Sequence, residues 1–388
     1  MDPMTDRQRF LATMNYEARD RCPICDFGFW PETIEAWHAQ GLPDWVGGGH
    51  RTTDTDAFFG MDKYGGGAPG VNVGLCPAFK REVVEDRGEQ EVIRNGEGVL
   101  LLRQKHMGSI PIHLDHTLKD RESWEEHFKP RLDPDTPERY PDWEEARKSW
   151  RNEACPYPRT VGGGSLFGWI RNWMGIENVS YLIYDDPGLF EEMVETIADL
   201  VVACHRRAFA EGASFDACQM WEDMCYNAGP LLGVEHFKKH LVPNYKRITE
   251  QLRANGCEIV WLDCDGKIDD LIPHWLEAGV NTMFPIEVGT WGGDPVRYRR
   301  EYGRELRLMG GFDKHILARG EGEIAAEVDR LTPLVEEGGY IPFADHRVPP
   351  DVPLSNYVFY LERAREAWGK GVNLKPMGID RESVITNK

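Results

Sequence analysis

The stretch EIVWLDCDGKIDDLIPHWLEAGVNTMFPIE, residues 258–287, decides the fold. A short apolar run at 258–262 is followed by a helical pattern over 267–278, which ends at Gly279, and by a second apolar run at 282–286. Two such runs joined by a helix are typical of a strand–helix–strand unit with parallel strands. Polar residues follow each run directly, and in parallel α/β folds this is where sites are built.

The same alternation continues on both sides of this unit. Further strands are predicted at 159–162, 215–221, 306–309 and 340–343. Further helices are predicted at 187–211, 233–255, 294–302, 321–337 and 353–369. The succession predicts an α/β fold, and a single α/β barrel with insertions can account for the whole chain of 388 residues.

The first 157 residues follow a different pattern. A helix is predicted over 5–20, and short alternating runs at 91–94 and 99–103 predict antiparallel strands. We therefore expect residues 1–157 to form an N-terminal helix and an irregular, partly β elaboration. It would pack on the barrel units formed by residues 158–388, so that the chain makes one structural domain overall.

Composition excludes several classes of function. The chain has 45 Lys and Arg against 65 Asp and Glu, a net charge of -20. Nucleic-acid binding and attachment to anionic membranes both need a basic surface, so we expect neither kind of partner. Hydrophobic residues make up 41%, which is enough for a large core, and no apolar stretch approaches the roughly 18 residues of a membrane span.

Cysteine usage indicates the compartment. Nine cysteines, an odd number, are spread along the chain, which favours a reducing cytoplasm over a disulfide framework. The pair Cys22 and Cys25 forms a lone CxxC without the second pair that a zinc knuckle needs. No apolar leader opens the sequence, so we expect a cytoplasmic protein.

Ionisable residues follow five successive predicted strands. They are Glu222 and Asp223, then Asp263 and Asp265, then Glu287, then Asp313 and Lys314, and finally Asp345, His346 and Arg347. Because parallel strand ends share one face of a barrel, these side chains are predicted to meet at its mouth. Carboxylates at close quarters repel one another unless protons, cationic side chains or a metal ion compensate them.

This acidic ring predicts a metal site or a general acid/base site, with Lys314 and Arg347 as compensating cations. An alternative for Asp265 and Asp313 is that they cap the helices that follow. His346 stands at a strand end between an acid and a base, which favours a functional role. His113 and His116 have ligand-like spacing, but their segment is predicted as strand or loop, so we expect a structural role.

The C-terminal half resembles the uroporphyrinogen decarboxylase superfamily. The matching motifs are Phe167-Gly168-Trp169 with Arg171-Asn172, Glu222-Asp223-Met224, Asn227-Ala228-Gly229-Pro230-Leu231, Asp263-Cys264-Asp265-Gly266, Pro285-Ile286-Glu287, Gly310-Gly311-Phe312-Asp313-Lys314, Gly338-Gly339-Tyr340 and the run from Asp345 to Pro353. The resemblance covers roughly residues 5–370 and implies a distorted (β/α)8 TIM-type barrel with a deep mouth. It also implies a homodimer.

Two chemistries are associated with this superfamily. Its cofactor-free decarboxylases hold a tetrapyrrole's carboxylates with arginines in an N-terminal Arg-Gln-Ala-Gly-Arg segment. The corresponding stretch here, residues 26–32, reads Asp-Phe-Gly-Phe-Trp-Pro-Glu, which is aromatic and acidic. We therefore do not expect the heme-pathway reaction.

The second chemistry is that of corrinoid-dependent methyltransferases, which use a zinc ion held by a His-x-Cys pair and a later Cys. In this sequence, Asp263 occupies the position of the motif's His, and Asp265 occupies the position of its first Cys. His346 lies near the position of the second Cys. Two carboxylates and an imidazole form a harder site, which suits zinc, iron or manganese and the polarisation of an oxygen rather than a thiol.

The first hypothesis is a metal-dependent O-demethylase that passes a methyl group from a small methoxylated substrate to a corrinoid protein. Its metal ligands would be Asp263, Asp265 and His346, and its catalytic groups would be Glu222, Asp223, Asp263 and His346. Its substrate-binding residues would be Trp30, Arg171, Glu287, Lys314 and Arg347. Two alternatives stay open: a cofactor-free decarboxylase or lyase acting on a carboxylic acid, and a non-catalytic ligand-binding subunit.

Overall fold

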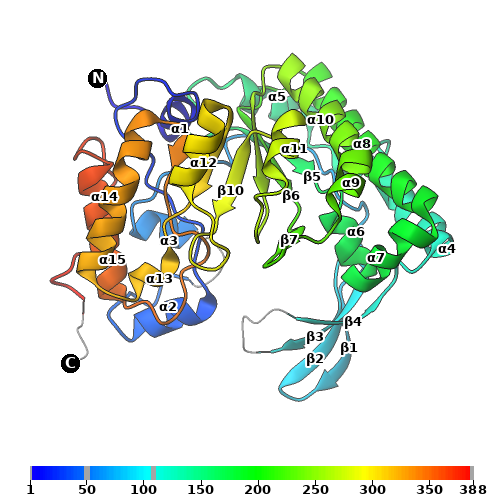
Figure 1. Ribbon diagram of the computed structural model, residues 1–388, viewed down its shortest axis with the longest axis horizontal. Coiled ribbons are helices and arrows are strands. Elements are labelled where there is room, and N and C mark those ends of the chain that lie inside the picture. The colour runs from blue at the N-terminus through cyan, green and yellow to red at the C-terminus, as the bar shows by residue number, and fades with distance from the viewer. Residues whose placement is uncertain (1, 48–52, 106–110, 385–388) are drawn as a thin grey trace.

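Six parallel strands form the centre of the fold. The computed structural model describes residues 2–47, 53–105 and 111–384 (Figure 1). The strands are β5 (Thr160–Gly164), β6 (Ala217–Trp221), β9 (Ile259–Asp263), β10 (Thr282–Ile286), β11 (Arg307–Gly310) and β12 (Tyr340–Ile341). Each strand lies beside its neighbour along the chain, in the order β12-β11-β10-β9-β6-β5. The predicted α/β barrel-type fold is confirmed, with six strands in the sheet of the described part.

Helices connect these strands on the outside, as the sequence predicts. They are α8 (Pro187–Ala210), α10 (Val242–Ala254), α11 (Ile272–Glu277), α12 (Pro295–Tyr302), α14 (Glu321–Glu337) and α15 (Leu354–Ala367). Shorter helical segments lie between them: α6 (Gly168–Met174), α7 (Ile176–Asp185), α9 (Val234–His236), α13 (Lys314–Leu317), a π-helix at Phe237–Leu241 and a 3-10 turn at Gly303–Glu305. A small hairpin, β7 (Cys225–Tyr226) and β8 (Gly229–Pro230), follows β6.

Two expected helices are shorter than predicted. The helix expected over 267–278 begins at Ile272, because the chain first turns at Gly266, whose positive φ and contact with the Cys225 backbone leave no room for a side chain. The helix expected over 5–20 ends at Met14, because Tyr16 adopts a left-handed backbone conformation with φ 59°.

Apolar residues fill the inside of the sheet. Alternate positions of the strands point inward, so that Ile259 and Trp261 of β9 face Phe284 of β10 and Met309 of β11. Phe10 and Met14 of α1 (Asp6–Met14), with Cys25 and Phe27, complete this inner cluster. The intervening strand residues face the helices, which gives both sides of the sheet a buried apolar surface.

N-terminal segments contact the chain after β12 and before β5, the two strands at the ends of the described sheet. On one side, the Val348 N–H donates to the Gly28 carbonyl at 3.0 Å, and Phe29 and Val348 form a parallel bridge. On the other side, the Gly67 N–H donates to the Pro158 carbonyl at 2.8 Å. The Asp62 N–H links the two segments through the Ile24 carbonyl at 2.7 Å. We call residues 24–30 and 61–67 the seam segments.

The rest of the N-terminal part forms separate elements. A four-stranded antiparallel sheet, β1 (Glu82–Arg87), β2 (Gln90–Arg94), β3 (Val99–Gln104) and β4 (Ile112–His116), projects from the body below α6 and α7 (Figure 1). The helices are α2 (Pro31–His38), α3 (Thr53–Phe58), α4 (Arg121–Ser123) and α5 (Trp143–Arg151), with a π-helix at Trp124–Phe128 and 3-10 turns at Lys129–Leu132 and Pro137–Arg139. The predicted strands at 91–94 and 99–103 correspond to β2 and β3.

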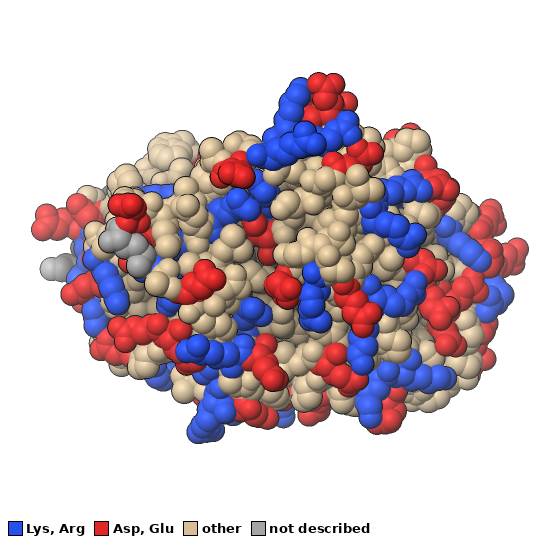
Figure 2. All heavy atoms as spheres, turned by 90° about the horizontal axis from the view of Figure 1, so that it is seen from above, with Lys and Arg blue, Asp and Glu red and all other residues tan. Residues whose placement is uncertain are grey.

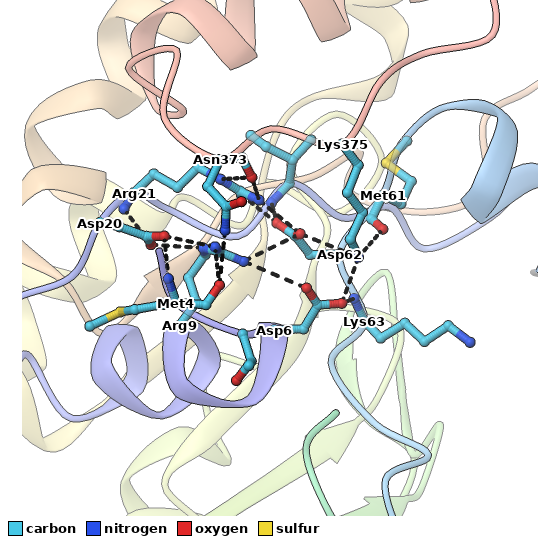
Figure 3. Close-up of polar contacts among 12 residues, drawn as sticks. Met4, Asp6, Arg9, Asp20, Arg21, Met61, Asp62, Lys63, Asn373 and Lys375 are labelled. Carbon is cyan, nitrogen blue, oxygen red and sulfur yellow. Dashed lines mark hydrogen bonds and ion pairs between the residues drawn. The ribbon is translucent and has the colours of Figure 1, made fainter. Parts of the chain in front are cut away.

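A buried ionic network joins the two ends of the chain (Figure 3). Arg9 donates to both oxygens of Asp20, at 2.9 and 2.8 Å, and Arg21 donates to Asp62 at 2.9 Å. Lys375 donates to Asp6 at 2.7 Å and thereby ties the C-terminal segment to α1. The side chains of Arg9, Asp20, Arg21 and Asp62 are at most 1% exposed, so the network belongs to the interior.

Charged side chains of both signs cover the face that Figure 2 shows. Acidic and basic side chains are mixed over this face without a large area of one sign. Among the described residues, no helix combines the length and apolar character needed to cross a bilayer.

Candidate active site

Acidic side chains and one imidazole meet where the parallel strands end. Possible ligand atoms of Asp265, Glu287 and His346 all lie within 4.8 Å of one another, and so do those of Asp223, Asp263 and Asp265. Asp223 follows β6, Asp263 ends β9 and Glu287 follows β10. The sequence therefore located the cluster correctly, because parallel strands deliver their last residues to one face.

Asp265 is the residue that the two groups share. Its N–H donates to Asp223 Oδ1 at 3.2 Å, and the next N–H, of Gly266, donates to Glu287 Oε2 at 3.2 Å. Its Oδ2 lies 3.5 Å from His346 Nε2, and its Oδ1 is buried and accepts no hydrogen bond from the described residues. A buried carboxylate oxygen without a donor can accept a water molecule or bind a cation.

The predicted metal ligands Asp263, Asp265 and His346 do not form one compact triad. Asp263 groups with Asp223 and Asp265, whereas His346 groups with Asp265 and Glu287. The sequence could not resolve this, because strand spacing fixes the edge of the sheet and not the direction of each carboxylate.

Burial and mutual repulsion raise the pKa values of three carboxyl groups. Burial, with the nearby Asp265 carboxylate, raises the pKa of Asp223 to about 6. Burial and Asp265 also raise the pKa of Glu287 to about 7, although Lys314 opposes the shift. Burial and three carboxylate neighbours raise the pKa of Asp263 well above its usual value. These groups can hold protons near neutral pH, or bind cations in their place.

Asp223 is held in an unusual backbone conformation. Its φ of 42° is rare for a residue with a side chain. Arg171 of α6 donates to the Asp223 carbonyl at 2.5 Å, and its guanidinium lies 5.4 Å from the centre of the Trp221 ring. Strain of this kind concentrates at functional sites. Arg171 is thus placed beside Asp223, and its predicted role in substrate binding stays a prediction.

Glu222 lies behind the cluster and is fully buried. Its carboxylate accepts hydrogen bonds from the N–H groups of Leu166, Phe167 and Gly168 at 2.7–2.9 Å, from the Ser165 hydroxyl at 3.0 Å and from the Tyr245 hydroxyl at 2.5 Å. These contacts fix the loop between β5 and α6. Glu222 thus positions this loop, and the acid/base role expected of it stays a prediction.

Asp345 is a site residue whose role the sequence did not reveal. It is completely buried, and its side chain accepts hydrogen bonds from Val288 N at 2.7 Å, Gly289 N at 3.1 Å and Lys314 N at 3.0 Å. Lys314 Nζ lies 3.5 Å from both Asp345 and Glu287. Asp345 thereby joins the ends of three strands, next to His346.

Aromatic rings form one wall of the site. The rings of Phe27 and Trp30 lie 4.9 and 6.2 Å from the His346 ring, between centroids. The Arg347 guanidinium lies 4.7 Å from the centre of the Trp30 ring. Burial lowers the pKa of Arg347, although Asp265 and Asp263 oppose the shift. Phe27 is not among the site residues predicted from the sequence. The aromatic composition of residues 26–32 is the feature of the sequence that could have indicated it.

A sequence model of the uroporphyrinogen decarboxylase (URO-D) family matches residues 160–367, more than half of the chain. The chain belongs to the URO-D family. The match begins at β5 and includes all six parallel strands and the whole carboxylate cluster. The aromatic wall at Phe27 and Trp30 lies outside it.

Two relatives are named uroporphyrinogen decarboxylase. The one from Methylococcus capsulatus is 25% identical over 194 residues, 48% of this chain and 51% of that protein. The one from Pelodictyon phaeoclathratiforme is 21% identical over 218 residues, 53% of this chain and 58% of that protein. The URO-D family chain thus matches little more than half the length of these relatives.

A solved methyltransferase from Methanosarcina mazei shares the fold. It is 14% identical in sequence, with a TM-score of 0.58 over 94% of this chain and 99% of that one. The likeness covers the N-terminal part of the URO-D family chain as well as the parallel strands.

Other residues singled out from the sequence lie outside the two groups of candidate ligands. Asp313 Oδ1 accepts the His315 N–H at 2.9 Å and so caps α13, the alternative considered for it. Cys264 is buried and its Sγ accepts the Met224 N–H at 3.4 Å. His113 and His116 lie on β4, with Nδ1 and Nε2 3.1 Å apart.

Proposed function

We propose that the chain is a metal-dependent methyltransferase of the O-demethylase type, with a small methoxylated substrate and a corrinoid protein as methyl acceptor. The observation that carries the proposal is the convergence of carboxylates and one imidazole on Asp265, whose Oδ1 is buried without a donor. This hard donor set fits zinc, iron or manganese. A reducing cytoplasm as the location is supported by the odd number of cysteines, nine in all.

Asp265 would be the central metal ligand, with His346 and Glu287 in reach on one side and Asp263 on the other. When bound, the metal supplies Lewis-acid polarisation of the methoxy oxygen. The aromatic wall of Phe27 and Trp30 supports a flat ring as the body of the substrate.

Protein groups would orient the substrate and move the proton. Arg347 lies over Trp30, where its charge can engage an acidic substituent on the same ring. When the bond between oxygen and methyl breaks, the methyl goes to the acceptor and the oxygen keeps the electron pair. Asp223, whose pKa burial raises to about 6, can give that oxygen a proton.

Metal content tests the proposal. Protein purified without added metal is expected to hold at least about one equivalent of zinc, iron or manganese. Asp263→Asn and His346→Ala are expected to lose metal and demethylation together, because each removes a ligand. Mass spectrometry of the metals, and the release of demethylated product from methoxylated aromatic acids with a corrinoid acceptor, provide the measurements.

Asp313→Asn is the matched control, because Asp313 also follows a strand but belongs to neither ligand group. It is expected to keep metal and activity. Unchanged metal content and activity in both Asp263→Asn and His346→Ala would refute the proposal.

A cofactor-free decarboxylase or lyase is the second candidate. Three cationic side chains at the site, Arg171, Lys314 and Arg347, support binding of a carboxylate, and Asp263 with its raised pKa supports proton transfer. Metal-free protein that releases carbon dioxide from a carboxylic acid would favour this function over demethylation.

A further inference from the structure

The two candidate ligand groups overlap at a single residue. One group contains Asp265, Glu287 and His346, and the other contains Asp223, Asp263 and Asp265. Candidate ligands therefore lie on both sides of Asp265, with His346 in one group and Asp263 in the other.

The side chain of Asp265 has the orientation that a bridging ligand needs. Its Oδ2 lies 3.5 Å from His346 Nε2, within the first group. Its Oδ1 is buried and lacks a hydrogen-bond donor in the described part of the chain. One oxygen thus lies near the imidazole, and the other is available as a ligand for a second ion.

The backbone around Asp265 holds one carboxylate from each group. The Asp265 N–H donates to Asp223 Oδ1 at 3.2 Å, and the Gly266 N–H donates to Glu287 Oε2 at 3.2 Å. These contacts use one oxygen of each side chain. Asp263, the other carboxylate of the second group, ends β9 close to Asp265.

Charge also favours more than one cation. Asp223, Asp263, Asp265 and Glu287 carry four negative charges when ionised. Lys314 approaches Glu287 at 3.5 Å but is shared with Asp345 at 3.5 Å and Thr290 at 3.2 Å. Arg347 is shared with the Trp30 ring. Two divalent cations would supply the remaining positive charge.

We infer that the site binds two divalent cations, bridged by the carboxylate of Asp265. Glu287 and His346 complete the ligands of the first ion, and Asp223 and Asp263 those of the second. Sites of this kind hold their ions about 3.5–4 Å apart and clamp two oxygens of a reacting group. The inference rests on the proposed metal-dependent function and adds a second ion to it.

Titration of metal-stripped protein with Mn²⁺, followed by electron paramagnetic resonance, tests the inference. The wild type is expected to bind about two equivalents, with the spectrum of an exchange-coupled pair. Glu287→Gln and Asp223→Asn are each expected to keep about one equivalent and to lose the coupling. Both variants retain an oxygen for the backbone N–H. Asp265→Asn is expected to lower the affinity for both ions more than tenfold.

The control and the remaining outcomes keep the two proposals distinguishable. Asp313→Asn is expected to bind like the wild type, and circular dichroism confirms that each variant is folded. Saturation of the wild type at one equivalent, or two equivalents without coupling, overturns the bridged pair and leaves the one-metal function standing. No binding of Mn²⁺ or Zn²⁺ overturns both.

Discussion

Asp345 illustrates how one buried carboxylate can organise a site without touching a substrate. It accepts N–H groups from Val288, Gly289 and Lys314, which follow two other strands, and it precedes His346 in sequence. Glu222 does the same for the loop at 165–168. Each is an acidic residue at a strand end whose role is set by distant donors.

Asp345→Asn is therefore predicted to weaken metal binding as well as the fold. The amide NH₂ would face N–H donors, so we expect a loss of about 2 kcal/mol in the free energy of unfolding. Because Glu287 and His346 would lose their common support, affinity for the ion should fall about tenfold or more. Urea unfolding and Mn²⁺ titration measure the two effects. A stability loss with unchanged affinity would show that Asp345 supports only the fold.

The sequence predicts the location of these residues better than their roles. Asp223, Asp263, Asp265 and Glu287 were predicted to meet, because the last residue of a parallel strand has only one edge on which to lie. Their division into two groups depends on side-chain direction and on the φ of Asp223, which local sequence does not encode.

At the scale of elements, regular alternation was predictable and irregular backbone was not. The helix expected at 187–211 is observed as α8 at Pro187–Ala210, because its apolar positions repeat along one face. The seam segments have no such repeat. Their partners are Val348 and Pro158, far along the chain, so no local pattern could predict their position.

Helix α8 contains a buried histidine that should make the fold sensitive to acid. His205 Nε2 lies 2.8 Å from the Gly162 carbonyl of β5, and burial lowers the pKa of His205 to about 4. The folded state therefore keeps the ring neutral, whereas the unfolded chain takes up a proton near the ordinary pKa of 6.5. Stability from this group is complete above pH 6.5 and is lost as the pH falls toward 4.

The predicted loss is about 2 kcal/mol of unfolding free energy between pH 7 and pH 5. His205→Gln can still donate to the Gly162 carbonyl but does not titrate. Between pH 7 and pH 5, its free energy of unfolding should therefore fall by about 2 kcal/mol less than that of the wild type. Urea unfolding of both proteins at the two pH values provides the comparison. Equal pH dependence would mean that His205 is not the acid-sensitive group.

At the scale of the whole molecule, the ionic network of Figure 3 connects α1, a seam segment and the C-terminal segment. Asp62 accepts hydrogen bonds from Arg21 at 2.9 Å and from Ile24 N at 2.9 Å, and lies 3.4 Å from Arg9. Removing the Asp62 carboxylate would take a negatively charged partner from two buried guanidinium groups, those of Arg9 and Arg21.

Asp62→Asn is predicted to lower the free energy of unfolding by about 3 kcal/mol, the usual effect of breaking a buried ion pair from one side. Asp329→Asn serves as the control, because its pair with Arg363 is 63% exposed on the aspartate side and should contribute less than about 1 kcal/mol. Similar losses in the two variants would show that the network adds nothing beyond a surface pair.

The contacts of the seam segments determine how late in translation the fold can be completed. Phe29 leaves the ribosome early, but its partner Val348 follows about 320 positions later. At about 5–20 residues per second, the wait is roughly 15–60 s. During that time the inner aromatic rings, Phe27 among them, lack the strands that cover them. The N-terminal part of the nascent chain therefore exposes apolar side chains through most of synthesis. Cellular factors that bind apolar segments have more time to bind this part than any later part of the chain.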